Sequence, residues 1–380
     1  MRVLHKILLN LVIGVTFFIL FYVFRTSESS SDGRYSSTFD NSCYTCSNNS
    51  IVFERRHDDS RGRPPTLEIA VPYEAKSGAD YVHNVWCIFT KVTSNALMKR
   101  KFHTFTNSLF DHSTGHVALH IIIDNSSRPV AQEVLETVKE TTRKDILVIK
   151  SMVSYYDVAY LAEELQDIVS AMQPHFSSQP GTYYSDALFF LSLGLHRIAL
   201  DQQRAAMFDA DTKLQENIEE LFQEFDRFGP DTLFGLAPEL TPVYRHVLYL
   251  YRSHHKDTRF GEPLSSHNDQ GFPGVNSGVI LFRLDRMRTN SLYNQLLEAK
   301  AVTSLTNKYN FKGHLGDQDF YTLLAMEHPD LVHLLPCVWN RQLCTWWRDH
   351  GYRDVFDAFA YCDGAVKLYH GNCNTPIPND

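Results

Sequence analysis

The chain has 380 residues, of which 43% are hydrophobic and 13% aromatic. This composition excludes a disordered chain and is sufficient for one large hydrophobic core or two smaller ones. The formal net charge of −8 disfavours a nucleic-acid partner, because surfaces that bind phosphate backbones are usually basic.

The N-terminus carries a predicted membrane anchor. Residues 7–24 are apolar and uncharged, long enough for a helix that spans a thin bilayer. Arg2 and Lys6 precede this stretch, so the positive-inside rule places residues 1–6 in the cytosol and the rest of the chain in the lumen. We therefore expect an uncleaved signal anchor and a single-pass type II protein, with a cleaved signal peptide as the alternative.

Two further segments follow the anchor. Residues 25–80 are rich in Ser, Asp, Asn and Arg and show no sustained periodicity, which is typical of a flexible stem. Residues 81–380 remain for a folded lumenal domain. Asn48 and Asn125 are N-glycosylation sequons, which such a lumenal chain can use.

From residue 84 the chain alternates between apolar runs and amphipathic segments. We predict, in order, a strand over 84–92, a helix over 94–110, a strand over 116–123, a helix over 128–142 and a strand over 145–150. This order indicates a parallel α/β sheet, in which ligands bind at the carboxyl ends of the strands. Thr90 and Lys91 follow the first strand and Asp124 follows the second, so the end of the first strand is a candidate nucleotide site.

A pair of carboxylates, Asp209 and Asp211, follows the predicted strand 204–208. The chain has 27 aspartates, so about two D-x-D spacings are expected by chance, and two occur. The position after a core strand favours a site, because residues i and i+2 of an extended segment point to the same side and can bind one cation. Two solvated turn aspartates are the alternative.

The C-terminal half contains further motifs. We predict helices over 183–200, 218–225, 242–252 and from about Asp317, with strands over 279–282 and up to His370. The triplet 276–278, Asn-Ser-Gly, precedes a strand, where small residues allow a ligand to approach the backbone or simply form a tight turn. Four cysteines in the last 44 residues favour two disulfides over a zinc site: Cys337, Cys344, Cys362 and Cys373.

Taken together, these motifs resemble glycosyltransferases of family 8, metal-dependent enzymes that retain anomeric configuration. The markers are D-x-D after a strand, N-S-G before a strand, the block GHLGDQDF and a terminal H-G. The runs PVYRH, WNRQLCTWWRDHGY and YHGNCNTPIP are similar to those of the xyloside α-1,3-xylosyltransferases in this family. The resemblance implies an α/β protein with the GT-A fold. Such a fold has a Rossmann-like, mostly parallel central sheet flanked by helices, here behind an N-terminal transmembrane helix and stem.

The resemblance also implies a metal site and a donor site. Asp209, Asp211 and His370 would bind the metal, whereas a histidine at a strand's end is otherwise most often structural. Mixed carboxylate, imidazole and phosphate ligation suits Mn²⁺, with Mg²⁺ as a substitute. The residues implied at the donor, UDP-xylose, are Ile88, Phe89, Thr90, Ala210, Ser277, Leu315 and Asn372.

By the same resemblance, Gln318 is the catalytic residue beside the reacting sugar carbon. Gln318, His246 and Trp347 would contact the acceptor, and a tryptophan offers a flat apolar face for a sugar. Glutamine is a poor nucleophile, so we expect front-face attack within an ion pair rather than a covalent glycosyl intermediate. In that reaction the leaving phosphate helps to deprotonate the acceptor hydroxyl.

The activity implied is retaining α-1,3 transfer of xylose from UDP-xylose to xylosyl-glucose O-linked on EGF-like repeats, such as those of Notch. We expect it in the endoplasmic reticulum membrane, with the Golgi as the alternative. Competing interpretations are transfer of another UDP-hexose, a metal-dependent nucleotide-sugar pyrophosphatase, and a silent binding module for EGF-like domains. The sequence does not decide the disulfide pairing, and Cys337–Cys362 with Cys344–Cys373 is adopted as a working hypothesis.

Overall fold

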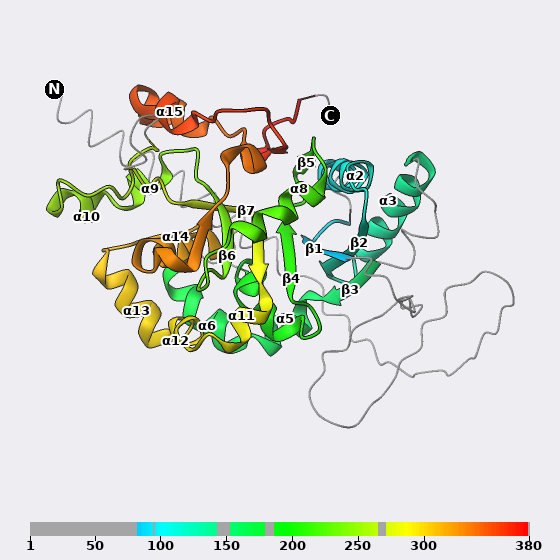
Figure 1. Ribbon diagram of the computed structural model, residues 1–380, viewed down its shortest axis with the longest axis horizontal. Coiled ribbons are helices and arrows are strands. Elements are labelled where there is room, and N and C mark those ends of the chain that lie inside the picture. The colour runs from blue at the N-terminus through cyan, green and yellow to red at the C-terminus, as the bar shows by residue number, and fades with distance from the viewer. Residues whose placement is uncertain (1–81, 94–95, 143–152, 179–185, 265–270, 379–380) are drawn as a thin grey trace, which may run out of the picture. The chain divides into compact units, whose positions relative to one another are not determined.

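A computed structural model (Figure 1) describes five stretches of the chain, residues 82–93, 96–142, 153–178, 186–264 and 271–378. The predicted cytosolic tail, membrane anchor and stem lie outside these residues, as does the strand predicted over 145–150. Within the five stretches, none of the helices has the length and apolar character needed to cross a bilayer.

The described residues form a seven-stranded sheet with the order β3-β2-β1-β4-β7-β6-β8. Its strands are β1 Val82–Phe89, β2 His116–Ile123, β3 Val153–Asp157, β4 Arg204–Phe208, β6 Phe234–Pro238, β7 Val275–Arg283 and β8 Val332–Leu334. Among them only β7 runs antiparallel to its neighbours, so the prediction of a mostly parallel sheet is confirmed. Besides β1, β2 pairs with β3, a strand that the sequence pattern did not reveal.

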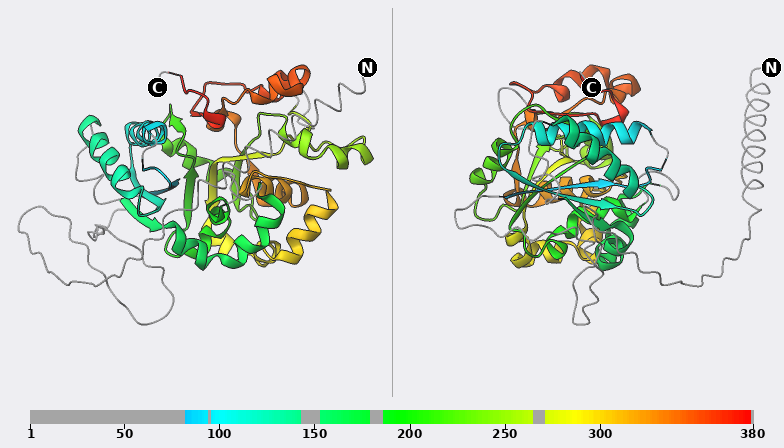
Figure 2. Two further views of the ribbon diagram at one scale, coloured as in Figure 1. Left: turned by 180° about the vertical axis from the view of Figure 1, so that it is seen from behind. Right: turned by 90° about the vertical axis from the view of Figure 1, so that its right-hand side faces the viewer.

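Alternating side chains of β1 give the sheet two buried faces. Val85 and Cys87 belong to one hydrophobic cluster, whereas Trp86 belongs to the other, because successive residues of a strand point to opposite sides. Figure 2 shows helices on both sides of the sheet. The first face is covered by α2 Ala96–Asp111, α3 Arg128–Thr141 and α8 Ile218–Gln223, and the second by α6 Gln166–Phe176, α13 Ala299–Lys308 and α14 Asp317–Glu327.

Short helices complete the fold. They are α5 Val158–Glu164, α7 Leu195–Ile198, α9 Val243–Val247, α10 Tyr249–His254, α11 Leu284–Thr289, α12 Ser291–Leu296 and α15 Arg353–Ala360, with tighter or wider turns in η2 Ala187–Gly194, η3 Glu224–Arg227, η4 Pro329–Leu331, η5 Cys337–Asn340, η6 Arg348–Tyr352 and η7 Asn372–Asn374.

Two predicted helices differ from the structure. The described part of 183–200 is the 3₁₀ helix η2 followed by a single turn of α7. At Gly194 a Cβ atom would lie 2.5 Å from Leu165, so packing against the preceding helices overrides the helical pattern there. The segment 242–252 is divided into α9 and α10 at Leu248, whose ψ is 10°. In contrast, α14 begins at Asp317 as predicted.

A small second sheet brings the C-terminal segment to the end of β4. Its order is β5-β10-β9, with β5 Thr212–Leu214, β10 Leu368–His370 and β9 Arg341–Gln342. Disulfides join Cys337 to Cys362 and Cys344 to Cys373, which confirms the working hypothesis for their pairing. Since β5 directly follows the acidic pair and β10 ends in His370, this sheet brings the predicted metal ligands together.

Candidate functional site

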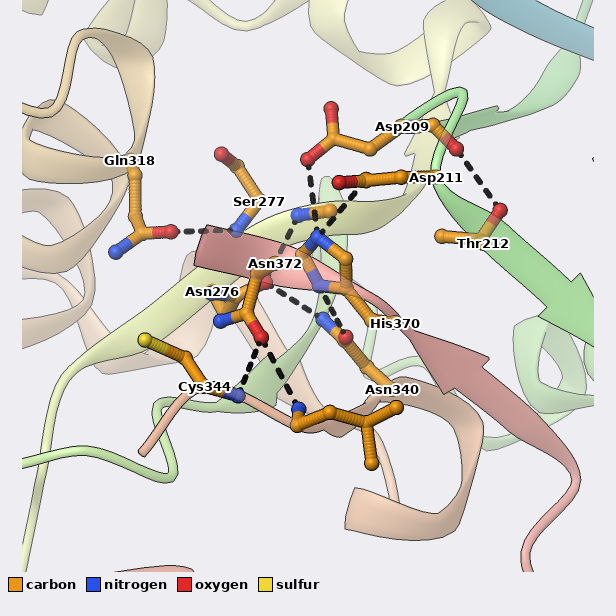
Figure 3. Close-up of polar contacts among 12 residues, drawn as sticks. Asp209, Asp211, Thr212, Asn276, Ser277, Gln318, Asn340, Cys344, His370 and Asn372 are labelled. Atoms are coloured by element: carbon orange, nitrogen blue, oxygen red, sulfur yellow. Dashed lines mark hydrogen bonds and ion pairs between the residues drawn. The ribbon is translucent and has the colours of Figure 1, made fainter. Parts of the chain in front are cut away.

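Asp209, Asp211 and His370 form one cluster in which their ligand atoms lie within 4.8 Å of one another. The His370 Nε2 is 3.3 Å from Asp209 Oδ2 and 3.4 Å from Asp211 Oδ1 (Figure 3). Asp209 follows β4, but Ala210 and Asp211 form a turn rather than the expected extended segment. The two carboxylates converge nonetheless, because the Asp211 backbone carbonyl accepts the Gly371 N–H at 2.8 Å and so holds the turn beside β10.

The cluster is open on one side and closed on the other. The Asp209 side chain is 58% exposed, whereas the His370 side chain is 4% exposed. Burial alone would lower the pKa of His370, but the hydrogen bonds to Asp209 and Asp211 outweigh it and raise that pKa to about 10. Burial also opposes ionisation of Asp211, yet His370 and Lys101 together lower its pKa, with Lys101 Nζ 3.1 Å from Asp211 Oδ2.

The far side of the imidazole is held by two buried asparagines. His370 Nδ1 is 3.0 Å from Asn340 Oδ1, and Asn340 Nδ2 donates to Asn276 Oδ1 at 2.9 Å. Asn276 Oδ1 also accepts the backbone N–H of Gly278, a group that can only donate. Nδ1 of His370 must therefore donate, which directs Nε2 toward the carboxylates. Two hard oxygens and an imidazole so oriented suit a divalent cation.

The N-S-G triplet, interpreted from sequence as a site of ligand approach or a tight turn, makes room for the imidazole. A Cβ atom on Gly278 would lie 2.2 Å from His370 Cε1. The middle residue, Ser277, donates its hydroxyl to Asp317 Oδ1 at 3.1 Å. Burial raises the pKa of Asp317 to about 7, although hydrogen bonds from Ser192 and Ser277 oppose that shift.

The predicted donor residues lie on five segments: the end of β1, the turn after β4, β7, the loop before α14, and η7 after β10. Ile88 and Phe89 end β1 and Thr90 follows it, while Ala210 separates the two acidic residues. The Phe89 side chain is fully buried and stacks on Phe102 with ring centroids 4.3 Å apart, so only its backbone can face a ligand.

Asn372 and Leu315 are also oriented by backbone contacts. The Asn372 Oδ1 accepts the backbone N–H groups of Leu343 and Cys344 at 3.0 and 2.9 Å, which leaves the Nδ2 amide for a ligand. The N–H of Leu315 donates to Asp319 Oδ2 at 2.7 Å. Both segments, predicted from sequence to contact the donor, are thus held by hydrogen bonds within the protein.

Gln318 lies at the start of α14 with its amide orientation defined on both sides. Its Oε1 accepts the Ser277 backbone N–H at 3.3 Å, and its Nε2 donates to Glu239 Oε2 at 3.2 Å. The side chain is largely buried, with a relative exposure of 8%. Glu239 itself is buried, and burial raises its pKa against the hydrogen bonds from Asn276 and Thr241.

His246 and Trp347, both predicted at the acceptor, contact each other with ring centroids 5.3 Å apart. His246 Nδ1 is 2.7 Å from the Tyr352 hydroxyl, and Trp347 packs edge-on against the same tyrosine. His246 is exposed and Trp347 half-buried. The helix that carries His246 is linked to α14 by Tyr244, whose hydroxyl donates to Asp319 Oδ1 at 3.0 Å.

Four residues of the site were missed by the sequence analysis: Lys101, Glu239, Asn276 as an individual residue, and Asn340. Glu239 and Asn340 are polar residues in the otherwise apolar runs LAPEL and CVWN, and that contrast was the available signal, whereas Lys101 follows Lys99 and Arg100 and gives no such contrast. Their burial and partners come from elements far apart in the chain, so the pattern alone gave no reason to choose them.

Comparison with known proteins identifies the family. No family model matches the chain. The human xyloside xylosyltransferase 1 is 46% identical to this chain over 334 residues, an alignment that covers 83% of this chain and 83% of that protein. The mouse xyloside xylosyltransferase 1 is 46% identical over 303 residues, which covers 78% of this chain and 75% of that protein. The apo crystal structure of the mouse protein superimposes with a TM-score of 0.72, covering 78% of this chain and 100% of that one at 46% identity. The GT-A fold expected from sequence is thereby confirmed, and the chain belongs to the xyloside xylosyltransferase family of glycosyltransferases.

Proposed function

We propose that this glycosyltransferase transfers xylose from UDP-xylose to xylosyl-glucose on EGF-like repeats, such as those of Notch, in an α-1,3 linkage with retention. The observation that carries the proposal is the convergence of Asp209, Asp211 and His370 beside the Ser277–Gln318 contact. Family membership supports a nucleotide-sugar donor and a glycan acceptor, and the names of the relatives support xylose as the sugar.

The proposed cofactor is Mn²⁺, with Mg²⁺ as a substitute. Asp209 and Asp211 offer carboxylate oxygens and His370 offers an imidazole nitrogen, a mixed set that suits Mn²⁺ better than Mg²⁺. Bound there, the ion would neutralise the charge that develops on the departing diphosphate. The exposed Asp209 lies on the open side of the cluster, where the diphosphate would enter.

The residues around the sugar support front-face attack. Gln318 directs Oε1 toward Ser277 and Nε2 toward Glu239, so its carbonyl dipole can stabilise positive charge on the reacting carbon. An amide is a poor nucleophile, and the attacking hydroxyl would pass its proton to the leaving phosphate. His246 and Trp347 would hold the acceptor, and Asn372 would donate its free amide to the donor.

The cellular placement is proposed from the sequence. Residues 7–24 would anchor the protein in the endoplasmic reticulum membrane, with residues 25–80 as a stem and residues 81–380 as the lumenal catalytic domain. The two disulfides agree with an oxidising compartment.

The test is an assay of the detergent-solubilised full chain with Mn²⁺, an EGF-like repeat carrying xylosyl-glucose, and a panel of UDP-sugars, read by mass spectrometry. The expected result is the gain of one pentose from UDP-xylose. A gain of a hexose would reassign the donor, and equally fast release of UDP without acceptor would indicate a pyrophosphatase. Asp209→Asn should abolish turnover, and unchanged turnover in that variant would refute the metal-dependent reaction.

A further inference from the structure

A buried carboxylate, Glu239, lies behind the reacting residues and has no assigned part in the reaction. It is 3% exposed and follows β6. Four donors converge on its two oxygens. They are the Thr241 backbone N–H at 3.0 Å, the Thr241 hydroxyl at 2.6 Å, Asn276 Nδ2 at 2.9 Å and Gln318 Nε2 at 3.2 Å. Buried carboxylates held by this many donors have a single orientation.

From Glu239 a continuous chain of hydrogen bonds leads in two directions. One branch is the single bond to Gln318. The other passes through Asn276 and Asn340 to the Nδ1 atom of His370, and Figure 3 shows these residues around the imidazole. Every side chain on both branches is buried, with relative exposures between 0% and 8%. Water therefore has little access to replace a lost partner.

The direction of every bond in this chain is fixed by backbone groups. The N–H of Ser277 must donate to Gln318 Oε1, and the N–H of Gly278 must donate to Asn276 Oδ1. Both amide nitrogens consequently face Glu239, which accepts from both. If Glu239 Oε2 were a donor, the Asn276 and Gln318 amides would have to turn their oxygens toward it. They would then lose the hydrogen bonds from the backbone N–H groups of Gly278 and Ser277.

We propose that Glu239 is a positioning residue that orients the Gln318 amide and the metal-binding imidazole at the same time. This inference rests on the function proposed above. Glu239 acts through its partners: it binds Nε2 of Gln318, which keeps Oε1 beside the Ser277 N–H, and through Asn276 and Asn340 it keeps Nε2 of His370 directed toward Asp209 and Asp211. Backbone N–H groups thus orient the oxygens of the Gln318 and Asn276 amides, and Glu239 provides the acceptor for both amide nitrogens.

The first test is Glu239→Gln. A glutamine offers one oxygen and one NH₂ group, and the Thr241 backbone N–H requires the oxygen. The NH₂ group then meets the amide nitrogens of Asn276 and Gln318, so both partners lose their acceptor. We expect kcat to fall by about 10- to 100-fold at saturating Mn²⁺ and the Mn²⁺ dissociation constant to rise by about 10-fold, the usual range for outer-shell partners.

A second variant separates the two branches. Asn340→Leu removes the acceptor of His370 Nδ1 but leaves Gln318 in place. It should raise the Mn²⁺ dissociation constant by about 10- to 100-fold and lower kcat at saturating Mn²⁺ far less than Glu239→Gln does. If Glu239→Gln shows this same pattern, without a fall in kcat at saturating Mn²⁺, the positioning of Gln318 is refuted.

The matched control is Glu224→Gln, the same substitution at a buried carboxylate on η3 that contacts Arg227 and His333. It should lower thermal stability and leave both kcat and Mn²⁺ affinity unchanged. A kcat of Glu239→Gln equal to that of this control overturns the proposal. Should Glu239→Gln fail to fold, Thr241→Val removes only the hydroxyl donor, and kcat should still fall by about threefold.

Mn²⁺ affinity is measured by electron paramagnetic resonance of the free ion. The turnover number is measured by hydrolysis of the UDP-sugar in the absence of acceptor, in addition to the transfer assay. Neither measurement depends on the identity of the acceptor. Absence of transfer to the EGF-like repeat by the wild type would refute the proposed function alone, whereas wild-type Mn²⁺ affinity in both Glu239→Gln and Asn340→Leu would refute the inference alone.

Discussion

The His370 imidazole packs directly against the backbone of β7 at Gly278. We therefore predict that Gly278→Ala lowers both the affinity for Mn²⁺ and the free energy of unfolding. The added Cβ would lie 2.2 Å from His370 Cε1 and 2.5 Å from Nδ1, both far below ordinary contact distance. The glycine lies in β7 beside an irregularity in its pairing with β6, and its carbonyl accepts the Asp209 backbone N–H at 2.9 Å, so the backbone is held there and the ring has to move. Reaching an ordinary contact of 3.4 Å requires a shift of about 1.2 Å.

This shift is large compared with the tolerance of a metal site. Ligand distances in such sites vary by about 0.2 Å, and a 1.2 Å displacement would also stretch the bond to Asn340. We expect a loss of Mn²⁺ affinity of at least about 10- to 100-fold. Overpacking should also reduce the free energy of unfolding by about 1–3 kcal/mol.

The assay is titration with Mn²⁺ in the presence and absence of UDP, together with chemical denaturation. Gly235→Ala on the neighbouring strand β6 is the control, because its Cβ would be crowded by Phe228 at 3.0 Å but would not contact the site. It should lower stability and keep Mn²⁺ affinity. If Gly278→Ala binds Mn²⁺ within about twofold of the wild type, the link between this glycine and the metal-binding imidazole is wrong.

Three further predictions concern separate parts of the site. Trp347→Ala should raise the KM for the acceptor by about 3- to 10-fold without changing the KM for UDP-xylose. The control is Trp346→Ala at the neighbouring residue, which is 50% exposed and should raise the acceptor KM less. Equal increases of the acceptor KM in the two variants would contradict an acceptor face on Trp347 alone. Lys101→Met should lower the free energy of unfolding by about 1–3 kcal/mol in the metal-free protein. The loss should be smaller with Mn²⁺, because the ion would compensate the charge of the Asp211 carboxylate. Chemical denaturation that gives the same loss with and without Mn²⁺ would argue against that compensation. Burial raises the pKa of Asp319 to about 7, above its unfolded value, so the folded state holds an extra proton and loses stability as pH rises toward 7, by about 1.4 kcal/mol per pH unit from this group. Asp319→Asn should reduce the slope of stability against pH by that amount, while the similar contribution of Asp317 remains. An unchanged slope in denaturation at several pH values would show that Asp319 does not contribute to it.

The sequence predicted those parts of the protein that depend on local pattern. Residues 204–208 and 116–123 form strands because their apolar runs fit a core strand, and α14 begins at Asp317 after the Gly316 turn. The strand β3 escaped prediction, since VSYYD has no apolar alternation that distinguishes it from a loop.

The candidate metal ligands were predicted only with help from the family resemblance. A D-x-D spacing was no commoner than chance, and a histidine that lies 159 residues beyond Asp211 gives no local signal. Glu239 and Asn340 remained unidentified because buried polar residues are defined by their partners, and those partners lie on other elements. Contacts between distant segments, rather than propensities, decide this part of the structure.

The small sheet β5-β10-β9 makes the Asp209, Asp211 and His370 cluster depend on two distant parts of the chain. The central sheet supplies Asp209 at the end of β4, whereas His370 arrives on a three-residue strand whose flanking loop is cross-linked by Cys344–Cys373. Because His370 also contacts Asn340 on η5, the position of this imidazole is determined by the cross-linked C-terminal segment as well as by the central sheet.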